Sequence, residues 1–199
     1  KAIRPNNDSF LELDFNGAEI RTLIGMMKMP QPTGDVHDFH LREVFHPGVT
    51  RSQAKVMFFS WLYGSSEMAN SAEGKKLESF YSRSRLLDQF YSESTVTTPY
   101  GKVIEGVSRH HALNYLVQST AAELALKQAL KIDYLLRRNG SGSTIAFLIH
   151  DAIVLDLKKE DEWLLPSIKA LMSSTNFGEF LVNIKKGECL GSLREISVG

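Results

Sequence analysis

The stretch Thr144-Ile-Ala-Phe-Leu-Ile-His-Asp-Ala-Ile-Val-Leu-Asp-Leu157 decides the fold. Two apolar runs, residues 145–149 and 152–157, flank the dipeptide His150-Asp151. Short apolar runs separated by two residues predict a β-hairpin with a tight turn. Asp151 then interrupts an apolar context, where a carboxylate is costly unless it is paired or binds a metal.

A second strand is predicted near the start of the chain, at residues 10–15. Its apolar side chains share one face, and Glu12 and Asp14 share the other. If this strand and the hairpin belong to one sheet, Asp14 and Asp151 converge at its edge. Carboxylates suit Mg²⁺, and two such ions about 3.5–4 Å apart can stabilise the attacking and leaving oxygens of a phosphoryl transfer. The alternative is that Asp14 caps the following helix and that Asp151 only serves a turn.

A long helix is predicted from about Thr50, a plausible N-cap, to Tyr63, with Gly64 ending it. Residues at intervals of four drift slowly around one face of this helix: Arg51, Lys55, Phe59 and Tyr63. The two cations suit a polyphosphate, and the two rings offer surfaces on which a base or sugar could stack. The alternative is an amphipathic helix with its rings in the core and its cations in water.

The remaining pattern is a mixture of helices and strands. Helices are expected at about residues 17–27, 35–45, 65–93, 109–138 and 161–173, strand pieces around a turn at 97–105, and a terminal strand at 180–184. With strands at both ends of the sequence and helices between them, the predicted class is α+β.

Composition bounds the function less sharply. The chain has 199 residues, 43% apolar and 23% charged, as in an ordinary soluble protein of one or two domains. The formal net charge of zero counts mildly against nucleic-acid binding. Basic residues nevertheless cluster through the middle of the chain: Arg51, Lys55, Lys75, Lys76, Arg83, Arg85, Lys102, Arg109, Lys127, Lys131, Arg137 and Arg138. The alternative is a solvated surface of mixed charge.

The cysteine count favours a reducing compartment, and the hydropathy pattern gives no sign of a membrane span. Cys189 is the only cysteine in the sequence, so no disulfide can form within the chain. The sequence has no run of about 18 apolar residues and does not open with a signal-peptide pattern. The expected location is the cytoplasm, with no membrane partner.

Three signatures occur in a fixed order. Residues 14–21 read Asp-Phe-Asn-Gly-Ala-Glu-Ile-Arg, residues 51–64 carry Arg-x3-Lys-x3-Phe-x3-Tyr-Gly, and residues 149–152 read Ile-His-Asp-Ala. These resemble motifs A, B and C of family A DNA polymerases, the group of bacterial DNA polymerase I and its phage relatives. Residues 35–37 and 114–122 are similar to two further segments of that family, so the resemblance covers nearly the whole chain.

The resemblance implies a role for each matching residue. Asp14 and Asp151 would hold two Mg²⁺ ions, which Mn²⁺ can replace, with the backbone carbonyl of Phe15 as a further ligand. Glu19 would lie under the sugar and exclude a 2′-hydroxyl. The remaining roles are triphosphate binding by His37, Arg51 and Lys55, packing on the incoming nucleotide by Phe59, template entry at Tyr63, primer support by His150, and minor-groove contacts by Asn114 and Gln118.

The resemblance also implies a right-hand architecture. The palm, an antiparallel sheet backed by helices, would comprise residues 1–45 and 98–199, and mostly helical, shortened fingers would comprise residues 46–97. The chain begins just before motif A, so the thumb and exonuclease domains are expected to be absent from it, and to come from the rest of the chain or from another subunit. Ala152 stands where motif C usually has a second acidic residue, and Gly17, Leu116 and Ser119 also depart from the family pattern.

The predicted function is that of a template-directed DNA polymerase that acts on primer-template DNA and deoxynucleoside triphosphates. One alternative is a catalytically weak or silent module, descended from a polymerase, that binds nucleic acid and works with a partner chain. Another is a nuclease or different nucleotidyltransferase with the same two carboxylates, which the helix of cations and rings disfavours because a nuclease does not hold a triphosphate.

Overall fold

The computed structural model describes residues 3–198, and the chain folds into two compact units. Unit 1 comprises the residues up to Ala18 together with those from Ala122 onward. Unit 2 comprises the residues from Glu19 to Ala121. Compactness by itself does not assign a palm or fingers, so the predicted palm and fingers ranges stay a prediction.

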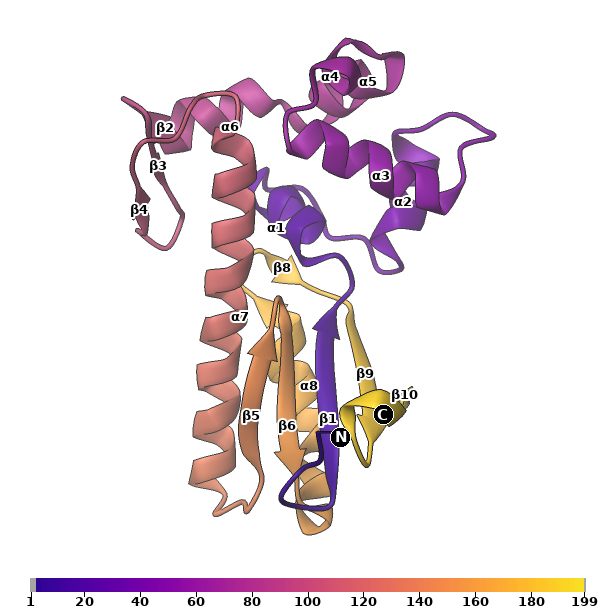
Figure 1. The fold of residues 1–199 in the computed structure, drawn as a ribbon, viewed down its shortest axis with the longest axis vertical. Coiled ribbons are helices and arrows are strands. Elements are labelled where there is room, and N and C mark those ends of the chain that lie inside the picture. The colour runs from indigo at the N-terminus through magenta and orange to yellow at the C-terminus, as the bar shows by residue number, and fades with distance from the viewer. Residues whose placement is uncertain (1–2, 199) are drawn as a thin grey trace. The chain divides into compact units, whose positions relative to one another are not determined.

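Unit 1 is built on a five-stranded antiparallel sheet with the strand order β10-β9-β1-β6-β5 (Figure 1). Its strands are β1 (Ser9–Phe15), β5 (Thr144–Ile149), β6 (Ala152–Leu157), β9 (Val182–Gly187) and β10 (Arg194–Glu195). The central strand β1 pairs with β6 on one side and with β9 on the other, although β6 and β9 lie far from it in sequence. The condition that the predicted first strand and the hairpin share one sheet is therefore met.

Helices cover one face of this sheet. In Figure 1, α8 (Leu165–Ser173) lies behind the strands, and the part of α7 (Ala112–Arg138) that belongs to unit 1 runs beside β5. Leu11 and Leu13 of β1 are fully buried, as the alternation of the strand requires on its core face. The Gln128 amide of α7 donates hydrogen bonds to the carbonyls of Leu171 and Met172, at 2.5 and 3.1 Å, and so fastens α7 to the end of α8.

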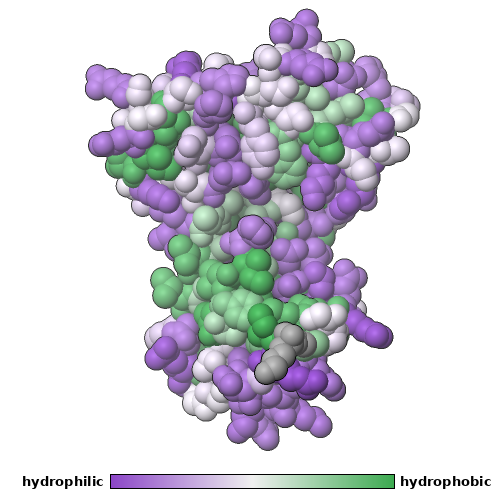
Figure 2. Space-filling model, in the orientation of Figure 1, coloured by the Kyte–Doolittle hydropathy of each residue, from purple (hydrophilic) through white to green (hydrophobic). Residues whose placement is uncertain are grey.

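An apolar stripe on α7 remains exposed. Leu126, Leu130 and Tyr134 are spaced four residues apart, and each is more than half exposed. Figure 2 shows apolar surface, in green, over this part of α7 and over the neighbouring strands of unit 1.

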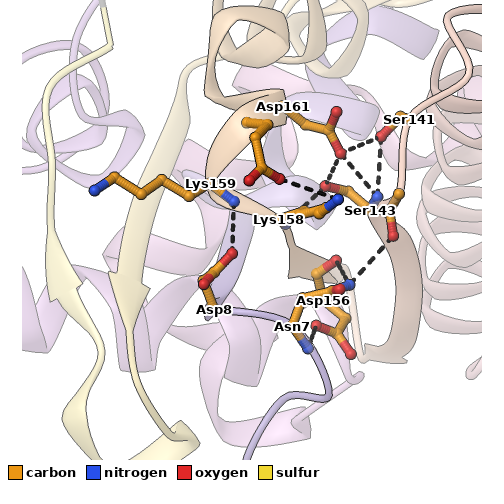
Figure 3. Close-up of polar contacts among 10 residues, drawn as sticks. Asn7, Asp8, Ser141, Ser143, Asp156, Lys158, Lys159 and Asp161 are labelled. Carbon is orange, nitrogen blue, oxygen red and sulfur yellow. Dashed lines mark hydrogen bonds and ion pairs between the residues drawn. The ribbon is translucent and has the colours of Figure 1, made fainter.

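A network of polar side chains joins the segments next to β5 and β6 at the end of the sheet that lies away from the β5–β6 turn (Figure 3). The Asp161 carboxylate, in the 3₁₀ helix η1 (Lys159–Leu164), accepts hydrogen bonds from the hydroxyls of Ser141 and Ser143, both at 2.7 Å, and from the Ser143 N–H at 2.9 Å. Burial raises the pKa of Asp161, but these hydrogen bonds outweigh it and hold the pKa below its ordinary value. The loop that leads into β5 is therefore fixed to the turn that follows β6.

Unit 2 is mainly helical. It contains α1 (Ala18–Met26, all but its first residue), α2 (Val36–Glu43), α3 (Arg51–Leu62), α4 (Ser66–Asn70), α5 (Ala72–Tyr81), α6 (Arg83–Phe90), the beginning of α7, and a small sheet of β2 (Tyr91–Ser92), β3 (Thr95–Thr97) and β4 (Val103–Ile104). Phe58, Trp61 and Tyr81 form an aromatic core, with ring centroids 5.7–5.9 Å apart. His40 is buried in the same core and hydrogen-bonds to the Tyr81 hydroxyl.

Two sets of hydrogen bonds fix the loop after α1 and the start of α3. The buried guanidinium of Arg21 donates to the carbonyls of Pro32 and Gly34, at 2.8 and 2.6 Å, which closes the loop after α1. Thr50 caps α3 through a capping box with Gln53, so the predicted start of this helix is confirmed.

The predicted helices and strands with a strong periodic pattern are confirmed, and the predicted bounds of those with a weaker pattern differ from the structure. The hairpin, the first strand and the helices α1, α2, α3 and α7 lie where they were predicted. The predicted helix at 161–173 is instead a 3₁₀ helix followed by α8, with Pro166 in the first turn of α8, where its missing N–H is tolerated. The predicted terminal strand at 180–184 is β9, shifted to 182–187, and it is not terminal because η2 (Leu190–Ser192) and β10 follow.

The strands β2, which lies within the range 65–93 expected to be helical, and β10 were not predicted. Two further short strands were not predicted either, namely β7 (Ser174–Thr175) and β8 (Gly178–Glu179). They pair as a small two-stranded sheet after α8.

No helix within residues 3–198 is both long and apolar enough to cross a membrane. The α+β class, with an antiparallel sheet backed by helices, is confirmed.

Candidate active site

Two carboxylates meet at one end of the unit 1 sheet. Asp14 is the next-to-last residue of β1, and Asp151 is the second residue of the two-residue turn between β5 and β6. The register pairs Leu13 of β1 with Ile153 of β6, so Asp14 lies one step nearer to that turn. The predicted convergence of the two carboxylates is thus what the strand order and register produce.

Asp14 sits in an environment that disfavours its negative charge. Burial raises the pKa of Asp14, and the negative charge of Asp151 raises it further. Lys185, through its positive charge, and Asn183, through a side-chain hydrogen bond, oppose this shift from the neighbouring strand β9. Two half-buried carboxylates that repel one another form a donor set that a divalent cation would relieve.

The donor set is small. Within residues 3–198, no group of three or more His, Cys, Asp or Glu side chains is placed to hold a metal ion. Magnesium commonly takes only one or two protein carboxylates and completes its coordination with water and phosphate. Asp14 and Asp151 therefore fit magnesium by their chemistry, and the buried side chain of Ala152, next to Asp151, offers no ligand atom.

His150 has an unusual backbone conformation. Its φ angle is 55°, in the left-handed region, and it is the first residue of the tight turn. Histidine tolerates this region better than a β-branched residue does. The turn thereby presents the His150 side chain as exposed beside Asp151.

The face of α3 predicted to bind a nucleotide is turned away from the core of unit 2. Arg51, Lys55 and Tyr63 are exposed and Phe59 is half-buried. The Phe59 and Tyr63 rings lie 5.7 Å apart, one turn from each other. A different face supplies the core, with Ala54, Phe58, Trp61 and Leu62 buried, so the alternative in which both rings form the core is wrong.

Three residues predicted to bind triphosphate gather in unit 2. His37 is only 5% exposed, and burial lowers its pKa first of all. The positive charges of Arg51 and Lys55 lower this pKa as well, which places both cations near the imidazole. Asp35 and Asp38 oppose the shift. His37 is therefore a neutral group beside two permanent cations.

A second cluster in unit 2 surrounds Tyr63. The Gln118 amide of α7 donates to the Tyr63 hydroxyl at 3.4 Å. Burial raises the pKa of Tyr63, and the negative charge of Glu19 on α1 raises it further. The Asn114 carbonyl oxygen is buried and has no hydrogen-bond partner among residues 3–198. Glu19, Tyr63 and Gln118 thus lie together, one turn of α7 from an amide whose oxygen is unsatisfied.

Sequence reasoning missed three side chains next to these clusters. Asn183 and Lys185 flank Asp14, and Asp35 binds Arg51. Asp35 directly before a helical pattern is an N-cap signal that could have been noticed. Asn183 and Lys185 gave no such signal, because their proximity to Asp14 depends on a strand register.

Comparison with known proteins gives a likeness in fold among solved structures. Neither a scan against models of protein families nor a search of curated proteins gives a match. Among solved structures, the POL domain of Pol1 from M. smegmatis, in complex with DNA primer-template and dNTP, is similar to this chain with a TM-score of 0.73 and 17% sequence identity. The likeness covers 94% of this chain and 41% of that one, so this chain spans about two fifths of that structure's length. The chain therefore has a polymerase-like fold, with an antiparallel sheet backed by helices in the manner of a polymerase palm.

Proposed function

We propose that this chain is the catalytic core of a template-directed DNA polymerase of family A, which adds deoxynucleotides to the 3′ end of a primer. The observation that carries the proposal is the convergence of Asp14 and Asp151 at the end of one palm-like sheet. The likeness in fold to a polymerase domain and the three ordered signatures support it.

In this proposal unit 1 carries the reaction centre. Asp14, Asp151 and the backbone carbonyl of Phe15 would hold magnesium, and the chemistry that it would supply there is stabilisation of the negative charge on the reacting oxygens. Asn183 orients the Asp14 carboxylate by a hydrogen bond, and Lys185 favours its ionised form. His150 supports the primer terminus from the adjacent turn.

Unit 2 binds the incoming nucleotide. Arg51 and Lys55 supply permanent positive charge for the triphosphate, and His37 supplies a neutral hydrogen-bonding group beside them. Phe59 packs on the sugar and base of the nucleotide, and Tyr63 guards the entry of the templating base. Closure of the fingers would bring these groups onto the nucleotide.

Selection of the correct nucleotide falls to the cluster around Tyr63. Glu19 lies under the sugar and rejects a 2′-hydroxyl, because a buried polar contact penalises the wrong substrate strongly. Asn114 and Gln118 contact the minor groove of the primer-template duplex, where acceptor positions are similar for all base pairs. The amide N–H groups of these two side chains would donate to those positions, because an amide oxygen can only accept.

The partners in this proposal are primer-template DNA and deoxynucleoside triphosphates, with a thumb or exonuclease region supplied by other sequence. Residues 1–45 and 98–199 would form the palm, and residues 46–97 would form the fingers. Because binding to phosphates releases counterions, DNA affinity should fall steeply with salt.

Ala152 favours a second candidate, a silent module that binds nucleic acid without catalysis, because one acidic group of motif C is missing. Primer extension at low salt, with Mg²⁺ and all four deoxynucleotides, separates the two when it is combined with a measurement of primer-template binding. The polymerase proposal predicts extension by the wild-type chain and none by Asp151→Ala, with equal DNA binding. If neither extends the primer although both bind it equally, the silent module is correct.

A further inference from the structure

Asp35 connects the two helices that carry the triphosphate-binding residues. One carboxylate oxygen, Oδ1, accepts hydrogen bonds from the backbone N–H groups of His37 and Asp38, at 2.9 and 3.0 Å, and so caps α2. The same oxygen accepts from Arg51 Nε at 3.2 Å, and Oδ2 accepts from Arg51 Nη2 at 2.7 Å. Asp35, which is fixed by the backbone of α2, thus holds Arg51, the first residue of α3, through two hydrogen bonds.

The hydrogen bonds to Asp35 use only one edge of the Arg51 guanidinium. Arginine carries five N–H donors in a rigid planar fork. Asp35 engages the edge formed by Nε and Nη2, which leaves Nη1 and the second hydrogen of Nη2 for another acceptor. The Arg51 side chain is 50% exposed, and within residues 3–198 no hydrogen bond engages its Nη1. The outer edge is therefore open to a ligand.

We propose that Asp35 is a positioning residue that holds Arg51 in the orientation in which its outer edge binds the triphosphate. This inference rests on the proposed function. A long arginine side chain loses rotamer freedom when it binds a ligand, and a partner that orders it beforehand lowers that cost. Asp35 also keeps Arg51 next to His37, because the carboxylate that holds the guanidinium accepts from the His37 N–H.

The negative charge of Asp35 works against this benefit, because it repels the triphosphate. That repulsion is reduced by the donors already bound to the carboxylate: two N–H groups at the N-terminus of α2 and the guanidinium itself. Lys55 adds a further cation on the same face of α3. We therefore expect orientation to outweigh repulsion.

The test compares Asp35→Ser with Asp38→Ser. Serine at position 35 can still cap α2 but cannot hold Arg51 by two bonds. Asp38 carries the same charge, 3.8 Å from Arg51 Nε, without forming a hydrogen bond, so its substitution controls for charge alone. Titration of each protein with dATP and Mg²⁺ gives the affinity, and single-nucleotide incorporation gives kcat and KM.

The expected result is that Asp35→Ser weakens dATP binding about five- to tenfold and raises KM by a similar factor, while kcat changes less than about twofold. Asp38→Ser should leave binding unchanged or tighten it. In an Arg51→Ala background, Asp35→Ser should have no further effect, because it acts through Arg51. Asp35→Asn, which keeps the cap and one of the two bonds, should be intermediate.

Tighter dATP binding by Asp35→Ser, or a loss equal in the wild-type and Arg51→Ala backgrounds, would overturn the inference. Thermal unfolding of each variant distinguishes a lost cap from a lost orientation, because Asp35→Asn retains the cap. If the wild-type chain binds dATP through Arg51 but Asp35→Ser binds it equally well, only the inference fails. If the wild-type chain does not bind dATP, the proposed function fails with it.

Discussion

The ammonium of Lys185 lies 2.7 Å from the carboxylate of Glu12, on the sheet face that also carries Asp14. Burial and Asp151 raise the pKa of Asp14, and Lys185 is the cation that opposes them. Lys185 therefore neutralises a third acidic group beside the two carboxylates of the candidate site.

Replacing Lys185 by Met should tighten the binding of Mn²⁺ to the chain. The substitution removes a cation near Asp14 and leaves Glu12 unpaired, and both changes attract a dication more strongly. We expect an affinity about three- to tenfold higher at low salt, measured from the electron paramagnetic resonance signal of free Mn²⁺. Lys186→Met is the matched control, because Lys186 points to the opposite face and pairs with Glu162 at 2.5 Å. Equal effects of the two substitutions would refute the assignment of Lys185 to the site.

Replacing Glu19 by Ala should weaken the rejection of ribonucleotides. The negative charge of Glu19 acts on Tyr63, so the two side chains lie near one another. In the proposed function Glu19 lies under the sugar of the incoming nucleotide, and its removal would open space there. We expect the ratio of kcat/KM for dATP to that for ATP to fall by about tenfold or more. Primer extension with each nucleotide separately measures this ratio, and an unchanged ratio would rule out the role of Glu19 as a sugar gate.

Unfolding of unit 2 should depend on the protonation of His40. Burial lowers the pKa of His40 to about 3, with a smaller contribution from His37. The unfolded chain, in which a histidine has a pKa of about 6.5, then binds more protons than the folded chain between these two values. Stability from the neutral His40 is therefore fully present above about pH 6.5 and falls as the pH decreases toward 3, by at most about 1.4 kcal/mol per pH unit.

Denaturant unfolding at pH 7 and at pH 4.5 measures this loss. His40→Phe should flatten the dependence on pH, because it removes the titrating group from the aromatic core. Tyr81→Phe is the control, since it deletes the hydroxyl that contacts His40 and retains the imidazole. If wild type and His40→Phe lose the same stability between the two pH values, His40 is not the responsible group.

Replacing Asp161 by Ala should destabilise unit 1 without affecting catalysis by the folded protein. The carboxylate accepts three hydrogen bonds, and its loss leaves a buried Ser143 N–H without that acceptor. We expect a loss of about 2–3 kcal/mol in the free energy of unfolding, measured by urea denaturation. Asp133→Ala removes an exposed pair with Arg137 on α7 and should cost no more than about 0.5 kcal/mol. Similar losses in the two variants would show that the network in Figure 3 contributes little.

The fold could be predicted where the chain has a strong local pattern. The apolar runs around His150-Asp151 fix a hairpin, and the capping pattern at Thr50 fixes the start of α3. The strand β10 has only two residues, Arg194 and Glu195, and both are charged and exposed, so no periodicity marks it. Its existence depends on pairing with β9, which no local pattern encodes.

The candidate site divides in the same way. Asp14 and Asp151 could be paired in advance only on the condition that their strands share a sheet, and the strand order meets that condition. The contacts of Lys185 with Glu12 and of Arg51 with Asp35 could not be predicted, because each joins two elements whose register or packing is set by the tertiary structure. The partners in an ion pair can be identified only once the fold is known, whereas the carboxylates of a motif can be identified from the sequence.

The central claim is that Asp14 and Asp151 act as one catalytic unit, and single-turnover incorporation of one nucleotide into a primer tests it most directly. The rate is compared among wild type, Asp14→Ala, Asp151→Ala and the double variant, with Asp133→Ala as a control for the loss of an exposed carboxylate. We predict that each single substitution lowers the rate by roughly a thousandfold or more and that the double variant is no slower than either single variant, because residues of one unit are not additive. Incorporation by Asp14→Ala or Asp151→Ala at the wild-type rate would contradict the account.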